Sequence, residues 1–347
     1  MSGTPTNKSD ARGRRDDEIR GALMLRAHPK TLLVAATGGH LEQLYRIRPR
    51  LVPECGEIQW VTHDDPQSRS LLAGERVTVV PYVPPRGYRE IARNTPAAWK
   101  MIRNGHFDRV ISTGAGVAIP FLAAARMSGV ECHYIESAAR ADGPSVTGRI
   151  AARMPGVRLY SQYQAWAGGD WNYRGSLFDS FEPQETDAPQ IRRVVVTLGT
   201  MRTYGFRRAV DHLLQLLPQV TDPGAEILWQ VGVTDPDGIS GDVRSSVPNA
   251  ELRDAIGAAD LVIAHAGIGS AITALELGKR PVLIPRRPQF NEHVDDHQSL
   301  IAGELGRRRL AVSAEADVLT TDDLIEAASA RVISTDAAGP FRLRTAS

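Results

Sequence analysis

The most informative motif of this chain follows a short apolar run that ends at position 264. It reads His265-Ala266-Gly267-Ile268-Gly269-Ser270 and leads into a helical pattern. The free N–H groups at the start of a helix, together with the helix dipole, stabilise bound phosphate groups. Gly267, Gly269 and Ser270 are therefore candidate ligands of a diphosphate, with His265 beside them.

A second group of polar residues follows the next apolar run, at 281–284. The stretch reads Glu292-His293-Val294-Asp295-Asp296-His297-Gln298. A sugar hydroxyl both donates and accepts hydrogen bonds, so mixed acidic, amide and imidazole side chains suit it. We expect a donor-binding site for a nucleotide sugar, made of Gly199, Thr200, His265, Gly267, Gly269, Ser270, Thr273, Glu292, His293, Asp296, His297 and Gln298.

Two residues of that set, Gly199 and Thr200, close another apolar run, at 193–198. They line the cleft near the phosphates or form an ordinary turn. The stretch Asp235-Pro236-Asp237-Gly238 has the D-x-D form that some transferases use for a metal. Proline, aspartate and glycine together are also what a surface turn requires, so we expect a turn here and no metal site.

The first half of the chain carries its own glycine turn, Gly38-Gly39-His40, directly after an apolar run. Paired glycines let the backbone turn sharply and approach a ligand closely. A histidine at the mouth of a cleft can act as a general base or hold a phosphate or hydroxyl group. The alternative is a plain turn with a surface histidine.

Two further turns end strands of the first half. One contains Gly114 and Gly116, and either approaches a ligand or simply connects a strand to a helix. The other contains Glu136, a candidate base and our second choice after His40. Its alternative is a structural carboxylate that caps a helix or pairs with Arg140.

Short apolar runs alternate with helical stretches on both sides of an acidic, proline-containing segment at 182–190. Such alternation predicts parallel sheets covered on both faces, whose ligands lie beyond the carboxyl ends of the strands. We expect an α/β protein of two Rossmann-like domains facing across a cleft. The expected division is a disordered tail (1–28), an acceptor- and membrane-facing domain (29–181), a linker (182–190), a nucleotide-sugar domain (191–335) and a tail (336–347).

Composition agrees with a globular protein of two domains. The chain has 347 residues, a net charge of +1 and only two cysteines. These values give no reason to expect nucleic-acid binding, a disulfide framework or a zinc site. The first 28 residues lack the apolar core of a signal peptide, and no stretch reaches the ~18 apolar residues of a membrane span. We expect a cytoplasmic protein, peripheral to the membrane.

The segment 81–103 mixes Arg86, Arg89, Arg93, Lys100 and Arg103 with tyrosines and a tryptophan. Basic and aromatic residues together suit an anionic lipid surface, so we expect this segment to contact the inner leaflet of the cytoplasmic membrane. An ordinary solvated helix is the alternative.

The second half resembles the catalytic subunit of the eukaryotic transferase that adds the second GlcNAc to dolichol-diphosphate-GlcNAc. The resemblance rests on VVVTLGT, ADLVIAHAGIGSAITALELGKRPVLIP and DDHQ. The first half resembles that enzyme's membrane-recruiting subunit, through ATGGHLEQL, STGAGVAIP and YIESAARADGPSVTGRIAARMPGVRLYSQY. Bacterial exopolysaccharide transferases of the same two subunits are similar through EHVDDHQ, and the peptidoglycan GlcNAc transferase is a more distant relative. Both subunits look fused in this chain.

The resemblance implies a GT-B fold of the family 28 type, inversion at the anomeric carbon, no essential metal and no cofactor besides the UDP-sugar co-substrate. It implies a lipid-linked saccharide, carried on a polyprenyl diphosphate, as acceptor. Gly267, Gly269 and Ser270 match the diphosphate loop, and His297 and Gln298 match the donor-sugar residues. Gly38, Gly39 and His40 match the acceptor-side glycine loop.

One position departs from the family pattern. Several relatives carry a glutamate for the uridine ribose where this chain has Thr273, and Glu276 lies one helical turn later. The neighbouring Arg286-Arg287 pair suits a carboxylated sugar such as glucuronate, because arginine pairs bidentately with carboxylates. The donor sugar is therefore expected to be GlcNAc or glucuronate.

We expect direct displacement, in which His40 takes the proton of the acceptor hydroxyl and the start of the helix at 268 stabilises the leaving UDP. The setting would be cell-surface polysaccharide synthesis. The alternatives are a UDP-sugar 2-epimerase of the same fold and a non-catalytic scaffold that recruits a partner to the membrane. The absence of GxGxxG from both halves argues against a nicotinamide dehydrogenase.

Overall fold

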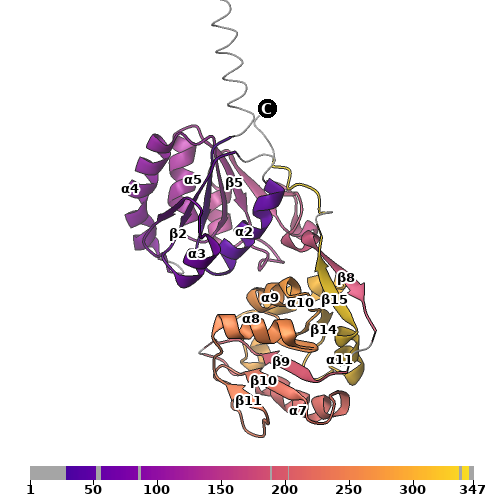
Figure 1. Cartoon of the computed structure of the whole chain (residues 1–347). Helices are drawn as coiled ribbons and strands as arrows, with labels where there is room; N and C mark the ends of the chain where they lie inside the picture. Colours follow the sequence, from indigo (N-terminus) through magenta and orange to yellow (C-terminus); the bar gives the residue numbers. More distant parts are fainter. Residues whose placement is uncertain are drawn as a thin grey trace, which may run out of the picture.

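The computed structural model describes residues 29–51, 56–84, 87–187, 190–201, 203–335 and 338–343. The expected tail at 1–28, and Arg86 of the basic segment, lie outside these ranges. The described chain forms two α/β domains, each built on a parallel sheet and joined at one side (Figure 1). The α/β class and the two Rossmann-like units predicted from the alternating pattern are confirmed.

The N-terminal domain has a sheet of seven parallel strands in the order β3-β2-β1-β4-β5-β6-β7. Its strands are β1 (Thr31–Ala35), β2 (Ile58–Thr62), β3 (Val77–Val79), β4 (Arg109–Gly114), β5 (Glu131–Ile135), β6 (Val157–Ser161) and β7 (Trp171–Tyr173). Its helices are α2 (Gly39–Leu51), α3 (Pro66–Leu71), α4 (Tyr88–Gly105), α5 (Ala118–Met127) and α6 (Val146–Ala152).

Strand β1 shows why this sheet is covered on both faces. Leu33 and Ala35 belong to a cluster that includes α2, whereas Leu32 and Val34 belong to a cluster that includes α4 and α5. Successive side chains of a strand point to opposite faces, so an uninterrupted apolar run needs helices on both sides. The turns after β1, β4 and β5 therefore gather at one edge of the sheet.

The C-terminal domain repeats the plan with six parallel strands in the order β11-β10-β9-β12-β13-β14. The strands are β9 (Arg193–Thr197), β10 (Glu226–Gln230), β11 (Asp242–Arg244), β12 (Leu261–His265), β13 (Val282–Ile284) and β14 (Val312–Ser313). The helices are α7 (Arg207–Val220), α8 (Asn249–Ala258), α9 (Ile268–Glu276), α10 (His297–Arg307) and α11 (Thr321–Ala328). Strands β12 and β13 are neighbours, so α9 and α10, which follow them, start at the same edge.

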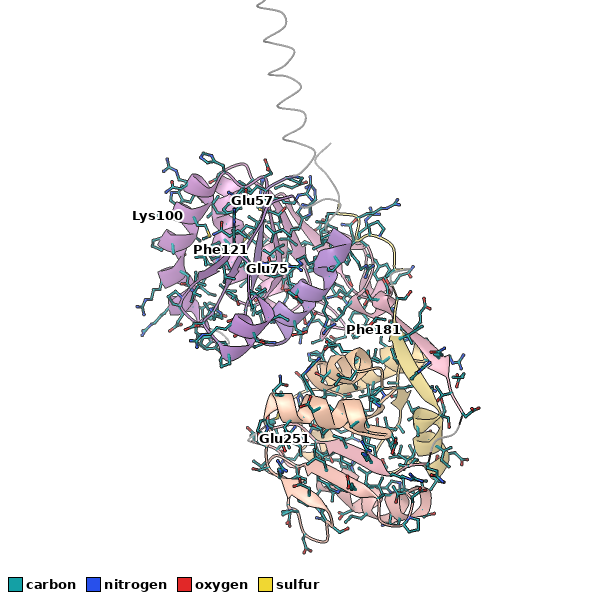
Figure 2. All side chains as sticks on the ribbon, viewed as in Figure 1. Glu57, Glu75, Lys100, Phe121, Phe181 and Glu251 are labelled. Atoms are coloured by element: carbon teal, nitrogen blue, oxygen red, sulfur yellow. The ribbon has the colours of Figure 1, made fainter. Side chains whose placement is uncertain are left out.

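The connection between the domains differs from the expected irregular linker at 182–190. Strand β8 (Phe181–Glu185) pairs antiparallel with β15 (Ala330–Ser334), and Pro183 faces Val332 in this ladder. A two-stranded ribbon has free edges that tolerate proline, and the partner strand is too distant in the chain for local composition to reveal it. Phe181 lies at the junction of the two domains (Figure 2).

The C-terminal end of the described chain differs from the expected tail at 336–347. Residues 338–343, expected as part of a tail, return to the N-terminal domain (Figure 1). The Phe341 side chain is fully buried against Tyr160, and its backbone N–H donates to the carbonyl of Arg50 at 3.1 Å. The chain therefore crosses between the domains twice. Among the described residues, no helix combines the length and apolar character needed to cross a bilayer.

Candidate functional site

The glycine turn after β1 faces the start of α9 in the other domain. Gly38 has a φ of +85°, which favours glycine, and its N–H donates to Oε1 of Gln67 at 2.6 Å. A Cβ atom placed on Gly39 would lie 4.0 Å from Cγ2 of Ile268, the first residue of α9. The glycine loops of the two domains therefore approach each other where the domains meet.

His40 is held at the start of α2 by the strand beside it. Its Nδ1 lies 2.6 Å from the carbonyl oxygen of Thr113, while the Thr113 hydroxyl donates to the His40 carbonyl at 2.8 Å. A carbonyl only accepts, so Nδ1 carries the proton and Nε2 has a free lone pair. Burial lowers the pKa of His40 and outweighs the carbonyl contact, so the ring is neutral at pH 7.

The same histidine lines an apolar pocket of about 420 Å³. Gly114, with a φ of +103°, lies against the His40 ring, and a Cβ atom on Gly116 would approach Val83 to 2.9 Å. The glycines of this second turn thus let β4 pass close to its neighbours. The apolar lining of the pocket comes mainly from Tyr82, Val83, Tyr88, Ile91, Ile119, Val146 and Ile150.

Glu136 is fully buried at the end of β5, and the protein's own donors occupy its carboxylate. Oε1 accepts from the N–H of Ser137 at 3.0 Å, and Oε2 accepts from the N–H and hydroxyl of Ser145 at 2.9 and 3.0 Å. Burial raises its pKa, against these hydrogen bonds. Because Ser145 caps α6, Glu136 secures the start of that helix, and His40 is the base candidate with a free atom beside an open pocket.

In the C-terminal domain the His265 ring is enclosed by two glycines. A Cβ atom on Gly199 would lie 2.8 Å from the ring, and one on Gly267 would lie 2.4 Å from it. Burial, together with the nearby Arg286 charge, lowers the pKa of His265 to about 4. The neutral His265 ring therefore packs between the turn after β9 and the start of α9. Thr200, the next residue of that turn after Gly199, is exposed.

The first turn of α9 is open. Gly269 is exposed and a Cβ atom there would have no atom within 4 Å, so its own surroundings do not require a glycine. Ser270 and Thr273 follow in the same helix and are partly exposed. Glu276 is not free to replace a ribose ligand, because it forms ion pairs with Arg46 and with Arg253.

Two of the expected donor-binding residues contact arginines, and for Glu292 this corrects the expected role. Glu292 is buried and bonds bidentately to Arg208, with both contacts at 3.0 Å. Asp296 is the residue before α10, and its largely exposed carboxylate accepts from Arg287 at 2.7 Å. The Glu292 carboxylate is therefore occupied, whereas the contact with Arg287 uses only one oxygen of the exposed Asp296 carboxylate.

Both arginines of the Arg286-Arg287 pair already donate hydrogen bonds within the protein, so they do not support recognition of glucuronate. Arg286 is buried and donates to the carbonyls of Leu198, Tyr204 and Glu292. Arg287 bonds to Glu315 and Asp296. Arg286 instead organises the turn after β9, beneath Gly199.

The remaining expected donor-binding residues, His293, His297 and Gln298, lie at or near the start of α10. Gln298 accepts from the N–H of Arg286 through Oε1 at 3.0 Å, and its amide N–H₂ has no partner among the described residues. The His293 ring bonds to Asp295, with Nδ1 at 3.1 Å from the carboxylate. His297 contacts Arg140 and Asp142 of the N-terminal domain. Sequence reasoning considered Arg140 only as a partner of Glu136 and missed Asp142, since only the folded domains bring them to His297.

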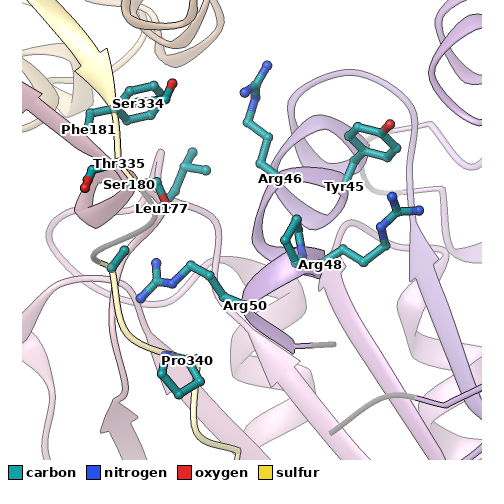
Figure 3. Close-up of a pocket in the computed structure, with 12 residues that line it drawn as sticks. Tyr45, Arg46, Arg48, Arg50, Leu177, Ser180, Phe181, Ser334, Thr335 and Pro340 are labelled. Atoms are coloured by element: carbon teal, nitrogen blue, oxygen red, sulfur yellow. The ribbon is translucent and has the colours of Figure 1, made fainter. Parts of the chain in front are cut away.

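A different hollow of about 520 Å³ lies between α2 and the β8–β15 ribbon (Figure 3). Its arginines have partners: Arg46 pairs with Glu42 and Glu276, Arg48 with Glu75, and Arg50 with Asp179. It lies away from both glycine loops and holds no free cation for a ligand. Within the described ranges, no group of three or more His, Cys, Asp or Glu side chains is placed to hold a metal.

Comparison with known proteins agrees with this geometry. Residues 193–330 match the glycosyltransferase family 28 C-terminal domain. The UDP-N-acetylglucosamine–N-acetylmuramyl-(pentapeptide) pyrophosphoryl-undecaprenol N-acetylglucosamine transferase of Chlorobaculum tepidum is 30% identical over 265 residues, covering 71% of this chain and 68% of that protein. The UDP-N-acetylglucosamine transferase subunit ALG13 of Yarrowia lipolytica is 43% identical over 68 residues, covering 19% of this chain and 33% of the subunit.

A solved structure shares the two-domain fold. The crystal structure of Acinetobacter baumannii MurG superposes with a TM-score of 0.54 at 18% identity, covering 86% of this chain and 89% of that one. At this level of identity the similarity establishes the fold alone, and it confirms the expected GT-B architecture. Taken with the facing glycine loops and the matched sequence, these similarities show that the chain belongs to glycosyltransferase family 28.

Proposed function

We propose that this enzyme transfers GlcNAc from UDP-GlcNAc to a saccharide carried on a polyprenyl diphosphate, in cell-surface polysaccharide synthesis. The observation that carries the proposal is the approach of Gly39 to Ile268, which sets the loop bearing His40 opposite the start of α9. A donor diphosphate at one loop and an acceptor hydroxyl at the other would meet between them.

The donor half of the proposal rests on α9 and α10. The N–H groups of Gly269 and Ser270 in the first turn of α9 would stabilise the diphosphate, including the charge that develops on leaving UDP, whereas the Gly267 N–H already donates to the carbonyl of His265 at 2.8 Å. The free amide of Gln298 suits the sugar hydroxyls, and the adjacent His297 ring, whose nitrogens contact Arg140 and Asp142, would line the same end of the site. GlcNAc is favoured over glucuronate because both arginines after β13 are already paired.

The reaction is a single displacement with inversion. The acceptor oxygen attacks the anomeric carbon, the bond from that carbon to the UDP oxygen breaks, and UDP leaves with the electron pair. The acceptor proton goes to Nε2 of His40, whose lone pair is free because Nδ1 donates to Thr113. No step calls for a metal ion.

The acceptor half rests on the surroundings of His40. The apolar pocket beside it suits the first isoprene units of a lipid carrier. Helix α4 borders this pocket and exposes Arg89, Arg93, Lys100 and Arg103, with Tyr88 at its start, and Lys100 points outward in Figure 2. This face would bring the enzyme to the anionic cytoplasmic surface of the membrane, as a peripheral protein.

The test has two stages. Thermal shift with UDP-GlcNAc, UDP-glucuronate and UDP-glucose should show strongest stabilisation by UDP-GlcNAc, since ligand at about 100 times Kd adds ~2.7 kcal/mol. Mass spectrometry should then detect transfer to a synthetic polyprenyl-diphosphate-GlcNAc in anionic vesicles. Release of free sugar without acceptor would instead identify an epimerase, and donor binding without any turnover would identify a scaffold.

A further inference from the structure

The loop after β5 reaches across the cleft to the start of α10. A guanidinium N–H of Arg140 donates to Nε2 of His297, and Oδ1 of Asp142 lies 3.3 Å from Nδ1 of the same ring. Asp295, on the same domain as His297, lies 3.4 Å from Nε2. One imidazole of the C-terminal domain is thus held by two side chains of the N-terminal domain.

These contacts fix the state of the ring. A guanidinium group has donors and no acceptor, so Nε2 must use its lone pair toward Arg140. The ring proton then lies on Nδ1, with the Asp142 carboxylate 3.3 Å away. The partner of one ring nitrogen decides which nitrogen is protonated, so residues of one domain set the tautomer of a histidine in the other.

Arg140 is prepared for this contact by its own loop. Its backbone N–H donates to the carbonyl of Ser137 at 2.9 Å, and its carbonyl accepts from the indole N–H of Trp166 at 3.0 Å. Among the described residues its side chain forms no ion pair with a carboxylate, and its buried Nε has no partner. The backbone of this loop is therefore held in place, and the guanidinium group of Arg140 contacts His297.

We propose that Arg140 and Asp142 are positioning residues that hold His297 from the opposite domain. The sugar-binding end of the donor site is then complete only when the two domains are closed as seen here. This inference rests on the proposed function, because it assigns His297 to the donor sugar. It predicts that the two side chains affect recognition of the sugar and not of the nucleotide.

Calorimetric titration with UDP-GlcNAc and with UDP separates these contributions. Losing a charge-assisted hydrogen bond to His297 should weaken UDP-GlcNAc binding by about tenfold in Arg140→Met, with UDP unchanged within about twofold. Arg140→Lys keeps one donor and should recover part of the loss. The matched control is Arg149→Ala, an exposed arginine of α6 in the same domain, which should change neither affinity.

A double-mutant cycle shows whether Arg140 acts through His297. In a His297→Ala background, Arg140→Met should cause no further loss of UDP-GlcNAc affinity. An equal loss in both backgrounds, or an equal loss for UDP and UDP-GlcNAc, would overturn the inference, because Arg140 would then bind the ligand directly. Unchanged UDP-GlcNAc affinity in Arg140→Met would overturn it as well.

The tautomer itself can be measured without any ligand, which keeps this inference separable from the proposed function. The ¹⁵N shifts of the His297 ring should show the Nδ1–H form in the wild type and a shift toward the Nε2–H form in Arg140→Met and Asp142→Asn. The Arg149→Ala control should match the wild type. A ring that stays in one form in all four proteins would contradict the inference even where the wild type transfers GlcNAc, whereas a wild type that binds no UDP-GlcNAc would contradict the proposed function.

Discussion

Arg46 on α2 and Glu276 on α9 form an ion pair that joins the two domains. Each of these helices starts in one of the glycine loops that face each other, so the pair ties together the two elements that frame the cleft. The Glu276 side chain is only 6% exposed and also bonds to Arg253 at 2.9 Å. Burial raises the pKa of Glu276, and the two arginines oppose this effect.

Glu276→Ala should therefore destabilise the protein beyond the usual cost of a surface pair. It would leave two guanidinium groups without their shared partner, at a cost of about 1–3 kcal/mol in the free energy of unfolding. Urea unfolding measures this cost. Glu251→Ala is the control, because Glu251 pairs with Arg244 at a half-exposed site worth about 1 kcal/mol or less. Equal effects of the two changes would contradict a special role for the cross-domain pair.

His40→Asn should lower the turnover number by about 10²–10⁴, because asparagine cannot take the acceptor proton. Affinity for UDP-GlcNAc should stay unchanged, since His40 belongs to the acceptor side. His212→Asn on α7 controls for the loss of a histidine remote from the cleft. A drop of less than about tenfold would refute the assignment of His40 as the base.

The same assignment predicts a pH profile. A base must be unprotonated, and burial sets the pKa of His40 below the usual 6.5. The acid limb of kcat/KM in the wild type should therefore have its midpoint below pH 6.5. Steady-state kinetics from pH 8 downward would show the acid limb, and its absence in His40→Asn would assign the limb to this residue.

Substitution by alanine should have different effects at Gly267 and at Gly269. Gly267→Ala would push a Cβ atom into the ring, so it should lower both stability and UDP affinity. Gly269→Ala meets open space in a helix, where alanine is favoured by about 1 kcal/mol, so stability should hold or rise while UDP affinity falls. Thermal unfolding and UDP titration measure the two effects. Unchanged UDP affinity in Gly269→Ala would mean that the diphosphate does not approach this turn.

The local part of this architecture was predictable from the sequence. Apolar runs ending in glycine turns indicated the parallel sheets and placed Gly39 and Gly267 at strand ends, because alternation and turn chemistry are local properties. The contacts that depend on distant segments were not predictable. Glu292 reads as a polar cleft residue until Arg208 is placed beside it, and Phe341 reads as part of a tail until the β8–β15 ribbon returns it to the N-terminal domain.

Arg287 offers a test of donor selectivity. Its guanidinium group is bound by Glu315 and Asp296, so it is not available for a sugar carboxylate. Arg287→Ala should leave the ratio of affinities for UDP-GlcNAc and UDP-glucuronate unchanged within about twofold, as competition titrations can measure. A selective loss of UDP-glucuronate binding would show that the arginine leaves its partners for the ligand.

Glu131 should make the N-terminal domain sensitive to acid. Burial opposes its ionisation, but the His133 ring, whose Nε2 lies 3.5 Å from the carboxylate, and the charges of Arg109 and Arg158 lower its pKa from 4.5 to about 2. An unfolded chain holds this carboxyl at its ordinary pKa. The stabilisation is therefore fully present above about pH 5, and is lost as the pH falls toward 2, because the unfolded state then binds the proton more readily.

The pKa difference corresponds to at most about 3 kcal/mol of unfolding free energy. Urea unfolding from pH 7 to pH 3 should show Glu131→Gln less stable than the wild type at pH 7, with the gap narrowing steadily below pH 5. Glu57→Gln, at a carboxylate that is 44% exposed, is the control and should show no such convergence. A gap that stays constant down to pH 3 would mean that packing of the side chain, and not its charge, stabilises this end of the sheet.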